Sequence, residues 1–488
     1  MLLKKLISKL KVKKVIGDLD INIEKLALNS LDVTKNALFI AVKGIDDDGN
    51  KYLLDAKLRG AVAVLTEQES DISITQIIVD DVRVELNKLV YEYFALKNAK
   101  IKFIGIVGTN GKTTTSFIIK SILISDGKKV GLIGTSGIYY ENKFISPELT
   151  TPDTVTLAEI ISDMANYGVE YVVMELSAHA IEQKRCDFIK FDCLIFTNCT
   201  EDHLDYFKDM ENYSSVKESV FNNLRTKLAV VNIDDSLGLN IINNNKVECY
   251  SYGVDNPSDV FSIDIKCVDD GTVFVMNLFD EILPLKFKYV GKFNVYNCMA
   301  GATACYKLGA SVSAIKRGIE NIKGLEGRME FIENYNGAKI FIDYAHTPDG
   351  LENTLKELKK ITDKRLVVLF GCGGNREKEK RSKMGIIAGK YADFSILTSD
   401  NPRYEEPYLI ISEIERGIRT KTLNYITIEN RYIATGYAIE FLKEGDVLVV
   451  AGKGAENYQE IMGVKTKYSD KECIKDIIAK ISLSGELI

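Results

Sequence analysis

Proline is scarce in this sequence and paired cysteines are missing, and each shortage excludes a class of protein. Seven prolines in 488 residues are too few for proline-rich linkers or collagen-like segments. The nine cysteines are odd in number, and no Cys-x-x-Cys pair occurs among them. Zinc ribbons, redox dithiols and a disulfide framework therefore lose support, and we expect reduced thiols in a cytoplasmic protein.

Long apolar runs and an excess of basic residues are also missing. No run approaches the ~20 apolar residues of a membrane-spanning helix. The basic N-terminus lacks the apolar core and the cleavage site of a signal peptide. Lys and Arg number 63 against 69 Asp and Glu, a net charge of −6, whereas general nucleic-acid binders are usually basic. We therefore expect no membrane span and no nucleic-acid partner.

The apolar residues that are present predict an α/β protein with doubly wound, parallel sheets. They make up 46% of a chain that is too long for one ordinary core. Val-, Ile- and Leu-rich runs alternate with helical patterns, which is typical of buried parallel strands joined by helices. The runs occupy 38–44, 60–67, 102–108, 171–176, 193–198, 228–233, 339–345, 365–371, 394–400 and 446–453, and the helical pattern is clearest over 113–125. The pattern changes near residues 98 and 327, so we expect domains at 1–98, 99–326 and 327–488.

A glycine-rich loop between a predicted strand and a predicted helix is the strongest single motif. It reads Gly108-Thr109-Asn110-Gly111-Lys112-Thr113-Thr114. Glycines let backbone N–H groups approach phosphate oxygens, and a helix N-terminus adds partial positive charge. In such loops the lysine neutralises the outer phosphates and the following hydroxyl binds Mg²⁺, so Lys112 and Thr113 are candidates for these roles. The loop predicts nucleotide binding without naming the reaction, since kinases, motors, switches and ligases all use one.

The three histidines of the chain, His179, His203 and His346, each follow a predicted strand and lie near carboxylates. Ligands gather at the carboxyl ends of parallel strands, so this repetition favours a functional role over a structural one. Glu175 ends a strand, where a carboxylate can hold Mg²⁺ bound to nucleotide phosphates. Asp343 and His346 could hold a ribose or orient a substrate, or they could only anchor their loop.

A series of motifs in fixed order resembles the Mur ligases, which are ATP-dependent amide-forming enzymes of peptidoglycan precursor synthesis. The series is GTNGKTT (108–114), MELSAH (174–179), FTNCTEDHLDY (196–206), GKFNVYN (291–297), GRME (327–330), DYAHTPD (343–349) and GCGGNRE (371–377). The segments DNPR (400–403) and GKGAE (452–456) resemble the branch that adds the third peptide residue, the UDP-N-acetylmuramoyl-L-alanyl-D-glutamate–meso-diaminopimelate ligases. The resemblance covers essentially the whole chain.

The resemblance implies a three-domain monomer with a site for UDP-linked substrate at the N-terminus, a central P-loop ATPase with a parallel sheet, and a C-terminal Rossmann-like domain for the incoming amino acid. It also implies that Lys217 is carbamylated. A carbamate turns the cationic amine into an anion that can bind a second Mg²⁺ together with His203, whereas an unmodified lysine would repel that ion. Mg²⁺ is thus the expected cofactor and ATP a co-substrate. The implied catalytic residues are Lys112, Glu175, His203 and Lys217, and the implied metal ligands are Thr113, Glu175, His203 and Lys217.

Further site residues are carried over from the family onto matching positions. On the ATP side they are the loop 108–114 with Asn294, Asn297, Arg328 and Asp343, and Arg431 is one more candidate. For the UDP-linked muramoyl dipeptide they are Ser30, Thr150, Thr151, Ser177, Gln183 and Arg185. The chain departs from the family pattern at Leu31, Asn375 and Ala455, where the family has Arg, Asp and His.

The incoming amino acid decides which ligase this is. Diaminopimelate carries a carboxylate at its distal carbon that lysine lacks, so its pocket should offer bidentate cations. Arg376 and Arg403 can supply two guanidinium groups, and Glu456 can take the ammonium. The implied diaminopimelate residues are Arg376, Asp400, Asn401, Pro402, Arg403, Gly452 and Glu456.

The predicted reaction phosphorylates the γ-carboxylate of the D-glutamyl residue with ATP, and the amine of diaminopimelate then displaces phosphate from the acyl phosphate. Three alternatives stay open: the same ligation with L-lysine or another diamine, a catalytically silent protein that binds the UDP-linked peptide, and a P-loop switch or motor. The sugar-contact and acceptor motifs have no role in the last of these.

Overall fold

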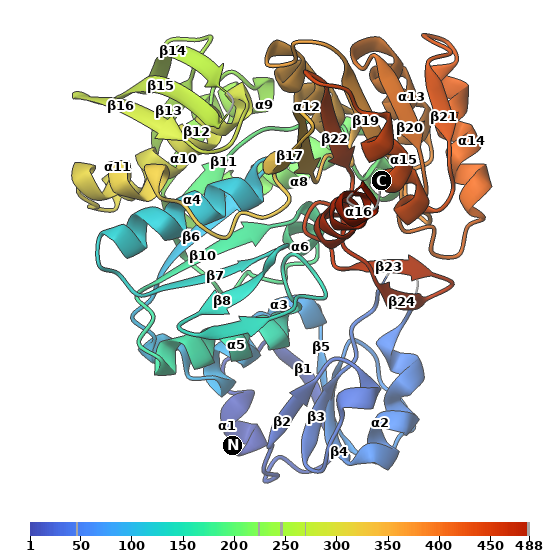
Figure 1. Cartoon of the computed structure of the whole chain (residues 1–488). Helices are drawn as coiled ribbons and strands as arrows, with labels where there is room; N and C mark the ends of the chain where they lie inside the picture. The colour runs from blue at the N-terminus through green and yellow to red at the C-terminus, as the bar shows by residue number, and fades with distance from the viewer. Residues whose placement is uncertain (45–46, 223–224, 245–246, 269, 486–488) are drawn as a thin grey trace. The chain divides into compact units, whose positions relative to one another are not determined.

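The computed structural model describes residues 1–44, 47–222, 225–244, 247–268 and 270–485, and the chain forms two compact units (Figure 1). The first unit comprises Met1–Gly105, Lys128–Leu194 and Asn223–Lys227, and the second comprises Ile106–Gly127, Ile195–Asn222 and Leu228–Ile488. Three strands, β6 (Lys102–Val107), β11 (Phe191–Phe196) and β12 (Thr226–Asn232), begin in the first unit and end in the second. Within the described ranges, no helix is both long and apolar enough to cross a membrane.

The first unit opens with a five-stranded sheet of order β1-β5-β4-β3-β2. All neighbouring strands pair in parallel except β1, which is antiparallel to β5. Buried Phe39, Ala56 and Val64 belong to the core of this sheet. The elements are α1 (Leu3–Leu6), β1 (Val12–Ile16), β2 (Lys25–Ala27), η1 (Ser30–Asp32), β3 (Ala37–Ile40), η2 (Gly49–Tyr52), α2 (Leu53–Arg59), β4 (Ala61–Thr66), β5 (Thr75–Val79), α3 (Val82–Tyr93) and η3 (Leu96–Asn98).

The rest of the first unit places a buried strand, β10, before a loop and a short helix. β10 pairs in parallel with β7, which continues into an antiparallel ladder through β8 and β9. Every residue of β10 is buried, as its continuous apolar run predicts. The elements are β7 (Val130–Gly134), β8 (Gly137–Tyr140), β9 (Lys143–Ile145), α5 (Thr154–Asn166), β10 (Tyr171–Leu176) and α6 (Ala178–Glu182).

The second unit begins with the helix that follows the glycine-rich loop. This helix, α4 (Lys112–Ser125), buries Phe117, Ile118 and Ile122 and packs on α10 and α11. The antiparallel ladder β14–β15–β16 follows the parallel pairs β12–β13 and β13–β14. The elements are α7 (Leu204–Phe207), α8 (Met210–Asn222), α9 (Ser236–Asn244), β13 (Glu248–Gly253), β14 (Val260–Val268), β15 (Gly271–Leu278), β16 (Glu281–Phe287), α10 (Lys292–Lys307) and α11 (Val312–Glu320).

The second unit ends in a doubly wound sheet of order β17-β18-β22-β19-β20-β21. Its strands pair in parallel except for the antiparallel edge strand β17. Alternate strand residues bury two faces: Val368 and Val449 pack toward α12, α13 and α14, whereas Val367 and Val450 pack toward α15 and α16 (Figure 1). The elements are β17 (Glu330–Tyr335), β18 (Ala338–Asp343), α12 (Pro348–Lys360), β19 (Leu366–Phe370), α13 (Glu379–Tyr391), β20 (Phe394–Leu397), α14 (Pro407–Ile418), β21 (Tyr425–Thr427), α15 (Arg431–Phe441), β22 (Val447–Ala451), β23 (Tyr458–Ile461), β24 (Val464–Lys467) and α16 (Asp470–Gly485).

Candidate active site

The glycine-rich loop has the geometry of a phosphate cradle at the N-terminus of α4. Gly111 precedes the helix with a φ of +84°, and a Cβ built on it would lie 2.4 Å from Oδ1 of Asn297. Only glycine avoids both the left-handed strain and this clash. The Nζ of Lys112 donates to the carbonyls of Gly108 and Thr109 at 2.7 and 2.8 Å. The lysine is thus folded back over the loop, where the oxygens of a phosphate would compete for it.

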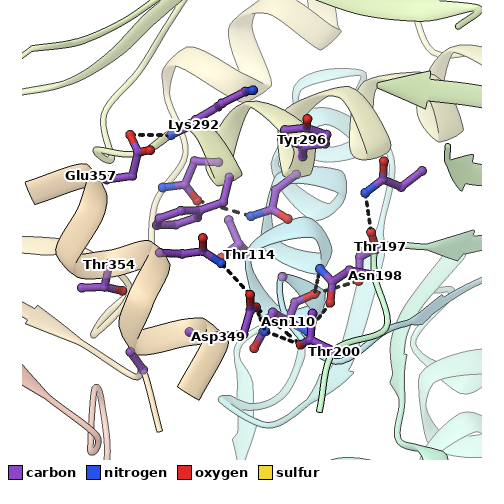
Figure 2. A pocket seen from close by; sticks show the side chains of 18 of the residues that line it. Asn110, Thr114, Thr197, Asn198, Thr200, Lys292, Tyr296, Asp349, Thr354 and Glu357 are labelled. Carbon is purple, nitrogen blue, oxygen red and sulfur yellow. Dashed lines mark hydrogen bonds between the residues drawn. The ribbon is translucent and has the colours of Figure 1, made fainter. Parts of the chain in front are cut away.

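A cavity of about 400 Å³ opens beside this loop (Figure 2). Asn110 and Asp349 meet at its edge, where the Nδ2 of the asparagine donates to Oδ2 of the aspartate at 2.8 Å. A site of this size suits a small organic ligand such as a nucleotide. Its lining includes Asn110, Gly111, Thr114, Asn294, Asn297, Arg328 and Asp343 of the predicted ATP residues, together with His346.

Residues from distant parts of the second unit converge on the loop. Asn294 donates to the Val290 carbonyl at 3.0 Å, and its Oδ1 accepts from Nδ2 of Asn297 at 3.3 Å. Arg328 donates from Nη2 to Oγ1 of Thr113 at 3.1 Å, with its guanidinium 4.2 Å from the ring centroid of Tyr344. Asn294 and Asn297 therefore line the same cavity as Arg328, which also contacts the loop through Thr113.

Burial shifts the pKa values of Asp343 and His346 in the direction that favours their neutral forms. Burial raises the pKa of the Asp343 carboxyl, which accepts a hydrogen bond from Thr354 at 3.1 Å. Burial, aided by the charge of Lys380, lowers the pKa of His346 to about 4. The Nδ1 of His346 lies 2.9 Å from the Tyr344 carbonyl. A neutral imidazole at this position can accept or donate one hydrogen bond without adding charge to the cavity.

Lys217 reaches the phosphate loop from α8. Its Nζ lies 2.6 Å from Oγ1 of Thr109, 3.6 Å from Sγ of Cys199 and 3.9 Å from the ring centroid of Tyr213. The side chain is buried, and burial lowers the pKa of its amine to about 7. His203 is a neighbour of the same tyrosine, with ring centroids 6.4 Å apart, and its Nε2 lies 3.3 Å from Asp202.

The side chains near the glycine-rich loop could bind a divalent cation only if Lys217 carried a negative charge instead of a positive one. In the part of the chain that the structure describes, no group of three His, Cys, Asp or Glu side chains is arranged to hold a metal ion. Thr113 and His203 are suitable donors, but a protonated Lys217 would repel the ion. A carbamate on Lys217 would supply the missing anionic oxygens.

The first unit collects the residues predicted for the muramoyl dipeptide around the end of β10. Thr151 donates from Oγ1 to the Glu175 carbonyl at 2.8 Å and accepts from the Ser177 backbone N–H at 3.0 Å. Arg185 donates to the Thr151 carbonyl at 3.0 Å and to Oε1 of Gln183 at 2.8 Å. These contacts fix a polar surface at the end of β10.

Glu175 and Thr150 join this cluster through Thr135. The carboxylate of Glu175 accepts from the Thr135 backbone N–H and Oγ1, both at 3.1 Å. The two hydroxyls of Thr135 and Thr150 lie 3.0 Å apart. Ser30 lies elsewhere in the first unit, between β2 and β3: it is buried at the start of η1 and forms a hydrogen bond with Asp55.

Arg376 and Arg403 lie on two adjacent loops of the second unit. A Cβ built on Gly373 would lie 2.9 Å from Nη1 of Arg403 and 3.7 Å from Cγ of Arg376. Both side chains therefore border the same glycine. Arg403 donates from Nη1 to the Gly374 carbonyl at 2.8 Å, and its Nε lies 3.3 Å from Glu460.

A buried lysine contacts other residues that are predicted to bind diaminopimelate. The Nζ of Lys453 donates to Oδ1 of Asn401 and to Oε2 of Glu456, both at 3.0 Å, and lies 3.9 Å from Asp400. Asn401 also donates to Glu456 at 2.9 Å. A Cβ on Gly452 would lie 2.8 Å from Oδ2 of Asp400. The segments 400–403 and 452–456, far apart in sequence, thus form one polar cluster.

Comparisons with known proteins show the family of this chain. Residues 106–305 match the Mur ligase middle domain, and residues 327–454 match the Mur ligase glutamate ligase domain. A protein of Clostridioides difficile (strain 630), UDP-N-acetylmuramoyl-L-alanyl-D-glutamate–2,6-diaminopimelate ligase, is 40% identical over 99% of this chain and 100% of its own length. The chain belongs to the Mur ligase family.

Solved structures confirm the expected Mur ligase fold. The structure of a UDP-N-acetylmuramoyl-L-alanyl-D-glutamate–2,6-diaminopimelate ligase covers 99% of both chains at 29% identity, with a TM-score of 0.71. The MurF ligase of Thermotoga maritima in complex with ADP shares the fold at 21% identity and a TM-score of 0.65, covering 94% of this chain and 97% of its own. The predicted α/β class, with its P-loop ATPase and its Rossmann-like C-terminal part, is thereby confirmed for this Mur ligase.

Three buried cations of this Mur ligase have positions that the sequence did not predict. Arg431 does not line the cavity; it is buried and forms a bidentate pair with Asp470, with both bonds at 2.8 Å. Lys453 and Arg381 were not singled out as site residues, although both are buried cations beside the acceptor segments. Lys453 lies in the motif GKGAE (452–456), which could have indicated its place in the site. Nothing in the local sequence distinguishes Arg381 from an exposed arginine.

Proposed function

We propose that this chain is an ATP-dependent ligase that adds meso-diaminopimelate to UDP-N-acetylmuramoyl-L-alanyl-D-glutamate, a step of peptidoglycan precursor synthesis in the cytoplasm. The curated relative and the solved structure with the highest similarities cited above carry this activity in their names. The observation that carries the proposal is that Arg376 and Arg403 both border Gly373, since Nη1 of Arg403 and Cγ of Arg376 lie 2.9 and 3.7 Å from a Cβ built on this glycine. Two guanidinium groups so placed suit a carboxylate, which diaminopimelate has at its far end and lysine lacks.

ATP binds in the cavity beside the glycine-rich loop. Asn294, Asn297, Arg328 and Asp343 contact its base, ribose and inner phosphates, and the backbone N–H groups at the start of α4 bind the outer phosphates. Lys112 leaves the carbonyls of Gly108 and Thr109 to pair with the transferring phosphoryl group. Thr113, Glu175, His203 and the modified Lys217 would hold Mg²⁺, which would neutralise charge on the phosphates when bound.

Lys217 is carbamylated in the active protein. A buried amine with its pKa lowered to about 7 has a far larger neutral fraction at cellular pH than an ordinary lysine, and the neutral amine is the form that adds CO₂. Addition forms the N–C bond and releases one proton, which leaves an anion where an ammonium would stand. The Thr109 hydroxyl, 2.6 Å from Nζ, can donate to this anion and fix its orientation.

The γ-carboxylate of the D-glutamyl residue attacks the γ-phosphorus of ATP and gives an acyl phosphate and ADP. The amine of diaminopimelate then adds to the acyl carbon, and the tetrahedral intermediate expels phosphate as the amide forms. Asp400, Asn401, Glu456 and Gly452 hold the amino-acid end of the acceptor, with Pro402 shaping the loop. Thr150, Thr151, Ser177, Gln183, Arg185 and Ser30 hold the UDP-linked substrate. Positioning and electrostatics supply most of the rate, because the carboxylate and the amine are the substrates' own nucleophiles.

Phosphate release from ATP alone, and from ATP with the UDP-linked dipeptide and diaminopimelate, tests the reaction class. The proposal predicts rapid release only when ATP, the UDP-linked dipeptide and diaminopimelate are all present, with one amide product for each phosphate. Release with ATP alone at the full rate would support a switch or motor, and no release in any mixture would support a silent binding protein.

A further inference from the structure

Arg381 is a fully buried cation that the proposed chemistry does not use. It lies near the start of α13, with no exposed surface. Its Nη1 and Nη2 donate to the two carboxylate oxygens of Glu405, both at 2.9 Å. Nη1 also donates to Glu413 at 2.8 Å, and Nη2 donates to the Gly373 carbonyl at 3.3 Å. One guanidinium therefore binds both the loop after β19 and the loop after β20.

These two loops are the ones that carry Arg376 and Arg403. Glu405 stands two residues after Arg403 and accepts the backbone N–H of Asn375, the residue before Arg376. In the other direction, Oδ1 of Asn375 accepts a hydrogen bond from the Tyr404 backbone N–H at 3.0 Å. The loops are thus joined in both directions, and the Arg381–Glu405 pair lies at the centre of the junction.

Further backbone contacts keep the loops in one register. The Gly374 N–H donates to the Asn401 carbonyl at 2.9 Å, and the Gly374 carbonyl accepts from Nη1 of Arg403 at 2.8 Å. Asn375 and Arg403 both have positive φ, 51° in each case. Such conformations cost free energy and persist where the surroundings fix them.

We propose that Arg381 is a positioning residue for acceptor selection: through Glu405 it fixes the spacing of Arg376 and Arg403 so that both reach the distal carboxylate of the acceptor. This inference rests on the proposed function, which assigns those two arginines to diaminopimelate. Arg381 is buried behind the loops and acts through them, not on substrate. A lysine cannot replace it, because a single ammonium lacks the planar fork that spans both carboxylate oxygens.

Steady-state kinetics of Arg381→Lys test the inference. The KM for diaminopimelate should rise about tenfold to a hundredfold, because displacements near 1 Å have effects of this size. The KM for ATP should stay near the wild-type value. Glu405→Gln keeps the shape of the side chain that Arg381 binds. It should also raise the KM for diaminopimelate and leave the KM for ATP unchanged, so it provides a second variant if Arg381→Lys folds poorly. Arg365→Lys is the matched control: Arg365 also binds a carboxylate with two nitrogens, that of Asp446, away from both loops.

A double mutant separates positioning from general destabilisation. If Arg381 acts through the loops that carry Arg376 and Arg403, adding Arg381→Lys to Arg403→Ala should raise the KM for diaminopimelate little further. The effects of substitutions at coupled residues do not add. Independent, additive effects would overturn the inference, as would an equal rise in the KM for ATP or an unchanged KM for diaminopimelate. A wild-type protein that releases no phosphate with diaminopimelate would overturn the proposed function and this inference with it. Normal wild-type turnover with an unaffected Arg381→Lys variant would overturn this inference alone.

Discussion

The Nζ of Lys217 lies 2.6 Å from Oγ1 of Thr109, although 108 residues separate them in the chain. This contact brings a buried amine to the loop that is proposed to hold the phosphates of ATP. The protonated amine at that place would repel Mg²⁺, whereas its carbamate would be a ligand for the ion. Much of the proposed chemistry depends on which of the two forms is present.

Lys217→Ala should abolish turnover, because it removes the anion that completes the metal site. Short carboxylates such as acetate should restore part of the activity of the variant, since they can occupy the space of the carbamate. The same carboxylates added to wild-type protein are the control and should not accelerate it. A variant with near-normal turnover would exclude the proposed role of Lys217.

Carbamylation of Lys217 should depend on pH in a predictable direction. Its pKa is lowered to about 7, and only the neutral amine adds CO₂, so the carbamylated fraction should rise with pH through about 7 at constant CO₂ pressure. Ordinary lysines, with pKa values near ~10.4, should remain unmodified over that range. Carbon-13 NMR with labelled CO₂ measures the fraction directly. A signal that does not change across this range, or that persists in Lys217→Ala, would refute the assignment.

Gly111→Ala should prevent ATP binding with only a modest loss of stability. The added Cβ would lie 2.4 Å from Oδ1 of Asn297, so the loop would have to move away from its phosphate-binding shape. Gly127→Ala is a matched control, because Gly127 has a φ of +77° and open space around its Cβ. Both variants should lose roughly 1–2 kcal/mol from left-handed backbone strain. ATP binding by calorimetry should be lost in Gly111→Ala alone; equal affinities in the two variants would contradict the assigned cradle.

Arg403→Ala should raise the KM for diaminopimelate about 10- to 100-fold, which corresponds to the loss of a charge-assisted hydrogen bond. The KM for ATP should change little, because Arg403 does not line the ATP cavity. Initial rates at varied concentrations of each substrate measure both constants. Equal rises in the two constants would show that the variant disturbs the whole site instead of the acceptor pocket.

His346 predicts a pH dependence of stability. Its folded pKa of about 4 lies below the ordinary value of ~6.5. The unfolded chain therefore takes up a proton between those values that the folded chain does not. The stabilisation from the neutral imidazole is complete above ~6.5 and is lost as the pH falls toward 4. Urea unfolding of wild type and His346→Gln should give curves that converge with falling pH, whereas a constant difference would contradict the lowered pKa.

Sequence patterns predicted the buried strands well because such strands are continuous apolar runs. The expected run 171–176 coincides with β10, and the helix expected over 113–125 is α4, which begins one residue earlier. The ladder β14–β16 was not predicted, because its strands alternate buried and exposed residues and β14 is interrupted by a bulge near Asp264. Alternation with irregular spacing gives a weaker signal than a run of Val and Ile.

The candidate site was predictable where chemistry lies in one short motif and not where it depends on distant partners. The glycine-rich loop is one segment, and its role follows from residue order. The Arg381–Glu405 pair joins residues 24 apart, and no local pattern indicates that this arginine is buried. Asn375 has a φ of 51°, a conformation that asparagine and the aspartate of the family pattern both tolerate better than most residues, so the backbone conformation does not explain this departure.

The most direct test of the proposed function compares acceptors at equal concentration. With ATP, Mg²⁺ and the UDP-linked dipeptide in excess, wild-type protein should release phosphate with meso-diaminopimelate and form the tripeptide product, while L-lysine should give little above the level without any amine. The physical reason is the distal carboxylate, which only diaminopimelate can present to Arg376 and Arg403. Faster phosphate release and product formation with L-lysine than with meso-diaminopimelate would contradict the proposed specificity.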